Sequence, residues 1–172
     1  MDLSTVSPID LQRLAETLWE ERLVVEQLLY RLTCAKLLLS ADEQRFVTRA
    51  IDEVEDEITR LREVELLRAG VVQEVAESAG GTIGDLSLGD LARDTPGPWP
   101  RIFGDLRTAF LGLAEEIEAT TAVNRALASS ALTRVRDSID ALSGADTTAT
   151  TYTSDGLTSV PTGIPLHLDR AL

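Results

Sequence analysis

The sequence predicts an all-α protein, an elongated antiparallel helical bundle or coiled coil of three long helices plus one short helix, with a flexible C-terminal tail. Hydrophobic residues make up 44% of the chain but aromatic residues only 4%, and a core built mainly of aliphatic side chains favours helix packing over a β-sandwich. Apolar residues recur every three or four positions through three long segments, as on amphipathic helices. After Gly144 the chain is rich in Thr and poor in apolar residues, so this part cannot offset the entropy of ordering.

These patterns divide the chain into a helical domain over residues 1–144 and a Thr-rich tail over 145–172. Within the domain, the expected helices cover about residues 8–40, 42–79, 87–93 and 100–143.

The first long helix has a clear start and a broad apolar face. Ser7 can cap it, Pro8 suits its first turn, and Asp10 completes a start similar to a capping box. Its main apolar seam follows a 3.5-residue period interrupted by one charge: Leu11, Leu14, Leu18, Glu21, Val25, Leu28, Leu32, Ala35 and Leu39. A second row, Trp19, Leu23, Tyr30 and Leu37, widens the stripe. We therefore expect this helix to be buried on a broad face.

The second long helix follows a turn and a new capping box predicted at Ser40–Glu43. Its expected seam contains Val47, Ile51, Val54, Ile58 and Leu61, and then Val64, Leu67, Val71 and Val75. The charged face from Asp52 to Glu65 is expected to face solvent. The helix should end near Gly80, because glycine readily takes the left-handed conformation that terminates helices.

A short interruption precedes the last long helix. Ser87 can cap a short helix over 87–93, and the prolines from Pro96 to Pro100 exclude regular structure between them. We expect Trp99, among these prolines, to pack over the helices as a plug.

The seam of the last helix begins with large apolar residues and becomes small or polar in its middle. It contains Phe103, Leu106, Phe110, Leu113, Ile117, Thr120, Asn124, Leu127, Ala131, Val135, Ile139 and Leu142. Small residues indicate either a close helical neighbour or an unfilled groove. Asn124 on the seam is expected to set the register of packing at some cost in stability.

Charge and cysteine content narrow the classes of function. The net charge of −13 and a pI of about 4.4 argue against nucleic acid and anionic membrane surfaces, which both need clustered Lys and Arg. Cys34 is the only cysteine, so the chain has no internal disulfide and no cysteine metal cluster. No signal peptide and no membrane span are recognised, so direct membrane insertion is not expected and the protein is expected in the cytoplasm.

Residues for catalysis are also missing. The only histidine, His167, lies in the predicted tail, which removes a Glu-x-x-His di-iron bundle. No phosphate-binding glycine motif is present. Adjacent carboxylates such as Glu20 and Glu21 point apart on a helix and make poor acid–base pairs. We therefore expect no enzyme activity, no cofactor and no metal site.

Three features in order resemble the FlgN-type flagellar export chaperones. The first helix has a similar Leu-rich run from Leu18 to Leu39, and the charged second helix follows a short turn. The last helix carries Asn124-Arg125-Ala126-Leu127 and leads to a tail with Thr151-Tyr152-Thr153-Ser154-Asp155-Gly156, similar to the family's Thr-Tyr-Asp-x-x-Gly ending. The likeness covers about residues 10–156. Thr121 and Thr153 stand where the family often has Asn and Asp.

The resemblance implies a cytosolic chaperone for the hook–filament junction proteins FlgK and FlgL. It would bind their C-terminal helices, prevent premature assembly and deliver them to the flagellar type III export gate through FlhA. The client contact then falls on the last long helix, at Asn124, Leu127, Ala131, Leu132, Val135, Ile139 and Leu142. The gate contact falls on the tail, at Tyr152, Asp155 and Gly156. Self-association of client-free chains through the same groove is a further expectation.

Other interpretations stay open. The groove residues of the last helix can equally pack against the first two helices, which would leave a coiled-coil scaffold or oligomerisation module. Tyr152 can be an incidental aromatic of the tail. A metalloenzyme that uses only carboxylates would be recognised by bound metal.

Overall fold

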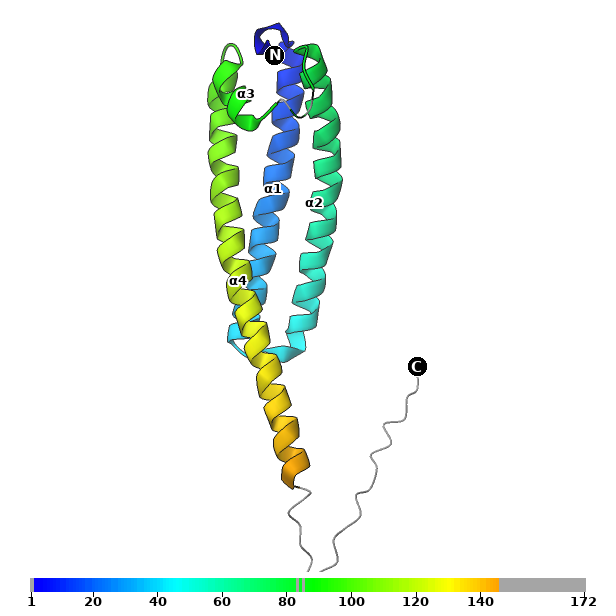
Figure 1. Ribbon diagram of the computed structural model, residues 1–172, viewed down its shortest axis with the longest axis vertical. Coiled ribbons are helices and arrows are strands. Elements are labelled where there is room, and N and C mark those ends of the chain that lie inside the picture. The colour runs from blue at the N-terminus through cyan, green and yellow to red at the C-terminus, as the bar shows by residue number, and fades with distance from the viewer. Residues whose placement is uncertain (1, 83, 85, 146–172) are drawn as a thin grey trace, which may run out of the picture. The chain divides into compact units, whose positions relative to one another are not determined.

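Helices make up nearly all of the structure, a computed structural model that describes residues 2–82, 84 and 86–145 (Figure 1). The elements are a 3-10 turn η1 (Leu3–Thr5) and the helices α1 (Pro8–Ser40), α2 (Gln44–Ser78), α3 (Leu88–Asp94) and α4 (Trp99–Ala145). The all-α class, with three long helices and a short one, is therefore confirmed. The chain divides into two units, residues 1–129 and 130–172, and each is described by itself.

Local chemistry explains where the helices begin and end. Ser7 caps α1 by accepting a hydrogen bond from the Asp10 amide at 3.2 Å, as predicted. Ser87 and Asp90 form a reciprocal capping box at the start of α3. α2 ends where Gly80 takes a positive φ of 73°, and the Gly81 amide donates to the Ala76 carbonyl at 2.9 Å. This is the bond pattern of a glycine-terminated helix.

The turn between α1 and α2 differs from the expected capping box. Asp42 takes the left-handed conformation (φ 56°), and Glu43 precedes the first turn of α2 without a side-chain hydrogen bond to it. Asp tolerates this conformation better than most residues because its short polar side chain can bond locally. The predicted turn is therefore present, but the predicted capping box is not, because no side chain caps the start of α2.

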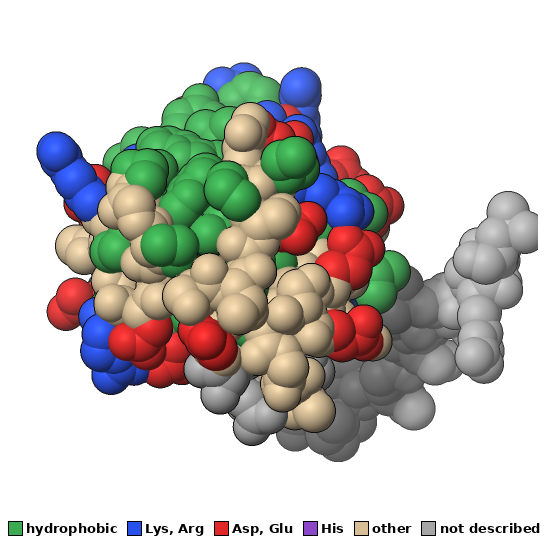
Figure 2. Space-filling model, turned by 90° about the horizontal axis from the view of Figure 1, so that it is seen from above, with side chains coloured by type: hydrophobic (Ala, Val, Ile, Leu, Met, Phe, Trp, Pro, Cys, Tyr) green, Lys and Arg blue, Asp and Glu red, His purple; other side chains and the backbone are tan. Residues whose placement is uncertain are grey.

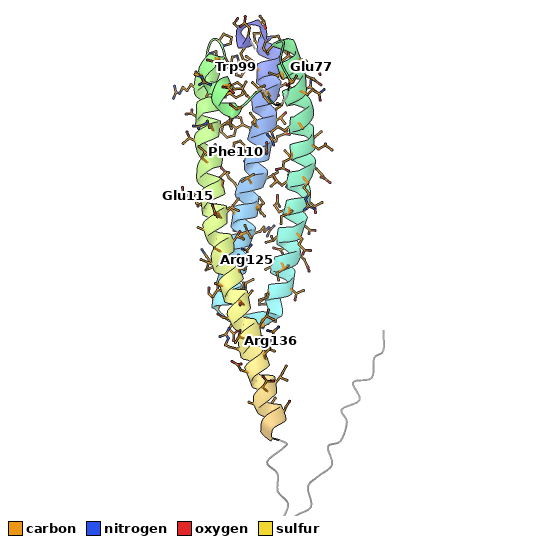
Figure 3. All side chains as sticks on the ribbon, in the orientation of Figure 1. Glu77, Trp99, Phe110, Glu115, Arg125 and Arg136 are labelled. Atoms are coloured by element: carbon orange, nitrogen blue, oxygen red, sulfur yellow. The ribbon has the colours of Figure 1, made fainter. Side chains whose placement is uncertain are left out.

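In the unit over residues 1–129, α2 runs antiparallel to α1 and to α4, while α1 and this part of α4 run in the same direction (Figure 1). Phe110 lies on the side of α4 that faces α1, and Glu115 lies on the outer side (Figure 3).

The hydrophobic core gathers at the end of this unit that holds η1 and α3. Its buried members come from all five elements: Leu3, Val6, Leu11, Leu14, Ala15, Leu18, Val71, Val75, Ala79, Leu91, Phe103 and Leu106. Trp99 packs against this cluster and stacks on Phe103 with 6.1 Å between ring centroids. The predicted Trp99 plug is confirmed, and η1 and α3 close the same end.

Away from that end, ion pairs join α1 and α2 in addition to a few buried apolar residues. Glu21 of α1 is buried and pairs with Arg68 of α2 at 2.8 Å. Burial raises the pKa of Glu21 above its usual value; the nearby Glu65 raises it further, and Arg68 lowers it. Arg31 and Glu53 make a second bridge between α1 and α2 at 2.8 Å.

Two expectations about burial were wrong. The second apolar row of α1 is exposed, with exposed fractions of 46%, 59%, 57% and 61% for Trp19, Leu23, Tyr30 and Leu37. The other helices leave this side of α1 uncovered, so the broad face is not buried. On α2, Val71 and Val75 are buried as predicted, but Ile51 and Leu67 are exposed, and Ala50 and Glu57 are buried although they were not expected on the seam.

Candidate binding surface on the last turns of helix α4

In the unit that begins at residue 130, the described residues are the last turns of α4, and they carry an uncovered apolar stripe. We call Leu132, Val135, Ile139 and Leu142 the distal stripe. Steps of three and four residues place these side chains on one face of a helix. Their exposed fractions are 61%, 48%, 55% and 73%. Polar residues on its other faces, such as Asp137 and Asp140, are also exposed, so this segment is amphipathic.

Asn124 and Leu127, also predicted to bind the client, lie in the unit over residues 1–129. The Asn124 side-chain amide donates to the Leu32 carbonyl of α1 at 2.9 Å. Its Oδ1 is buried and accepts no hydrogen bond from a described residue. Thr120, one turn earlier, is buried, and Leu127 is half-buried. Asn124 therefore joins α4 to α1, at the position where it was expected to set the register.

The predicted client residues thus fall into two groups with different surroundings. It brings the four distal-stripe residues together on an open face, and it places Asn124 against another helix. Ala131 is half-buried. The predicted gate residues Tyr152, Asp155 and Gly156 lie outside the described residues.

The distal stripe can supply moderate binding energy to an apolar partner. Complete burial of a Val, Leu or Ile side chain contributes about 1.5–3 kcal/mol. At the observed exposed fractions, covering all four side chains contributes roughly 4–7 kcal/mol before the cost of association. The partner best matched to such a stripe is another amphipathic helix, whose anchors have the same spacing.

Sequence reasoning did not identify Trp19, Leu23, Tyr30 and Leu37 of α1 as exposed. The signal was present, because apolar residues fall on opposite faces of this helix. In a three-helix bundle, the two neighbouring helices cannot cover both of these faces of α1.

The described residues offer little for metal or membrane chemistry. Within residues 2–82, 84 and 86–145, no group of three His, Cys, Asp or Glu side chains is placed to hold a metal ion. Among the same residues, no helix has both the length and the apolar content to cross a membrane.

Comparison with known proteins gives one match. A family model described as FlgN protein matches residues 1–159. No curated protein and no solved structure matches the chain.

Proposed function

The chain belongs to the FlgN family of flagellar export chaperones, and from this premise we propose that its clients are hook–filament junction proteins of the FlgK and FlgL kind. It holds their C-terminal helical region in the cytoplasm and prevents premature assembly. Its role is binding, without catalysis.

The distal stripe carries this proposal. Its four apolar side chains are open to solvent and have the spacing of one helix face. An amphipathic client helix would cover them through anchors at intervals of three and four residues. While the client helix lies on the distal stripe, its own apolar face is also covered and is not available for assembly with other subunits.

Delivery to the export gate is the second part of the proposal. Tyr152 and Gly156 match the Tyr and the Gly of the family's ending, Asp155 lies between them, and we assign these three residues to docking on FlhA. The client and gate contacts then occupy different parts of the sequence, so that one chain can hold both partners.

Light scattering on mixtures with a C-terminal FlgK or FlgL fragment tests the proposal. We expect a complex whose mass equals the sum of the two chains at tens of micromolar, a concentration that corresponds to about −6 kcal/mol. The absence of any complex at that concentration contradicts the client assignment. Self-association that the client does not disperse would instead support the scaffold interpretation.

A further inference from the structure

A groove along α1 and α2, away from the distal stripe, has the form of a second helix-binding site. Three hollows lie between these two helices. The first is lined by Arg13, Thr17, Glu20, Leu66, Leu67, Gly70, Val71 and Glu74. The second is lined by Glu20, Leu23, Val24, Gln27, Arg60 and Val64, and the third by Cys34, Leu38, Phe46, Arg49, Ala50 and Glu53. We call the three together the α1–α2 groove.

The spacing of the lining residues shows that the hollows follow one side of the helix pair. The first two hollows share Glu20. The α1 wall recurs at residues 13, 17, 20, 24, 27, 31, 34 and 38, in steps that alternate between four and three. Arg31, at one of these positions, bridges to Glu53 of α2 between the second and third hollows. A strict 3.5-residue period keeps positions aligned along a coiled helix pair. The three hollows are therefore spread over roughly 37 Å of α1, from residue 13 to 38 at 1.5 Å per residue, and the Arg31–Glu53 bridge separates the second hollow from the third.

The walls of the groove combine uncovered apolar side chains with a free negative charge. Leu23, Leu66, Leu67 and Phe46 are exposed, and a side chain added at Gly70 would meet nothing within 4 Å. Figure 2, which views the molecule from the η1 end, shows hydrophobic side chains gathered over part of that end. An occupant that covers the apolar walls must be apolar along one face.

The charged residues beside the groove indicate which charge the edges of its occupant carry. Arg13 pairs with Glu74 across one end of the groove at 2.5 Å, and Arg31 pairs with Glu53 further along at 2.8 Å. Glu20, shared by the first two hollows, is exposed and forms no ion pair with a described residue. On the α2 side, Asp56 and Glu63 are exposed and likewise unpaired among the described residues. These free carboxylates favour Lys or Arg beside the apolar face of the occupant.

We infer that the α1–α2 groove binds a second amphipathic helix of the exported client, one with basic residues along the edge of its apolar face. This inference rests on the proposed function and deepens it, since the distal stripe alone offers only moderate binding energy. The client then contacts the chaperone at two sites, and its second helix packs along α1 and α2 as in a coiled coil.

Photo-crosslinking from Cys34 tests which molecule lies in the groove. Cys34 is the only thiol of the chain and lines the third hollow, so a benzophenone maleimide attaches there selectively. With the full-length chain and a C-terminal FlgK or FlgL fragment, we expect the crosslink to join Cys34 to the fragment. The same label on Glu115→Cys in a Cys34→Ser background, on the outer side of α4 (Figure 3), should give no such product. Crosslinks only to a second copy or to the chain's own residues 146–172, or none while the fragment is bound, overturn the inference.

Affinity measurements separate this inference from the proposed function. Leu67→Asp, in the groove, should lower the affinity for the fragment at least tenfold without lowering the unfolding temperature, because Leu67 is exposed. Leu111→Asp, at a position that is also exposed but lies on α4, should bind within twofold of the unmodified chain. Glu20→Gln should weaken binding about threefold at low salt, as expected for one exposed ion pair. An unmodified chain that binds no fragment overturns both proposals. A chain that binds the fragment unaffected by Leu67→Asp overturns the groove alone.

Discussion

Replacement of Val135 by Asp separates an exposed binding face from a packed core. Val135 is 48% exposed, and substitutions at exposed helical positions usually change stability by no more than about 0.5 kcal/mol. We expect the helical content and the unfolding temperature of Val135→Asp to match those of the unmodified chain. Phe103→Ala is the opposite control: Phe103 is completely buried, and truncation of such a side chain costs about 3–5 kcal/mol.

The effect of Val135→Asp on client binding should be much larger than its effect on folding. The substitution removes about 1 kcal/mol of apolar burial, from half of a valine side chain. It also places an unpaired carboxylate against an apolar client face, which costs about 2 kcal/mol or more. The sum of about 3 kcal/mol corresponds to roughly a hundredfold loss of affinity.

Isothermal titration with the C-terminal client fragment measures this loss, and circular dichroism with thermal unfolding checks the fold. Leu111→Asp on the same helix is the matched control, since Leu111 is exposed but outside the distal stripe. Cooperative unfolding of Val135→Asp would show that the face is core. Unchanged affinity in a folded variant would show that the client does not touch Val135.

Three other predictions concern the register contact, the buried carboxylate and the C-terminal residues. Asn124→Leu should raise the free energy of unfolding in urea by about 1 kcal/mol. The variant loses one hydrogen bond to the Leu32 carbonyl but also removes a buried Oδ1 that accepts no hydrogen bond from a described residue. Clear destabilisation would contradict this. Burial holds the pKa of Glu21 above its usual 4.5 despite Arg68, so the folded state binds this proton more tightly than the unfolded state does. The stability gained in this way is complete below pH 4.5 and is lost as the pH rises through the raised pKa. Glu21→Gln should flatten that part of the stability profile, and an unchanged slope would refute the assignment. Truncation after Ala145 should preserve helical content and client binding but abolish binding to FlhA; a collapse of helicity would show that the removed residues are structural.

Much of the fold follows from local signals in the sequence. The cap at Ser7, the capping box at Ser87 and the glycine that ends α2 depend only on neighbouring residues, so their positions can be read directly. The seam of α4 from Phe103 to Thr120 was also predicted, since large apolar residues at a helical period have one stable placement.

Local sequence signals could not predict whether the second apolar row of α1 is buried or exposed. Periodicity identifies the faces of a helix but not the number of helices available to cover them. Trp19 and Leu23 therefore looked like core, although both are exposed. On α2, the buried seam passes through Glu57 and close to Arg68, because partners on other elements decide whether a charge can be buried.

The candidate site shows the same division. The spacing of Leu132, Val135, Ile139 and Leu142 was readable as one face, but its exposure depends on tertiary packing. Asn124 shares that sequence pattern, and only the structure shows its hydrogen bond to α1. The α1–α2 groove was not expected, since its walls mix charged and apolar residues and form a surface only when both helices are present.

Hydrogen exchange with and without a saturating C-terminal FlgK or FlgL fragment tests the central claim most directly. The last turns of α4 are open to solvent, and amides in such segments exchange through local opening. If the distal stripe holds the client, the amides of residues 130–145 exchange more slowly in the complex than in the free chain. Unchanged exchange over these residues, with the fragment demonstrably bound, would contradict the account.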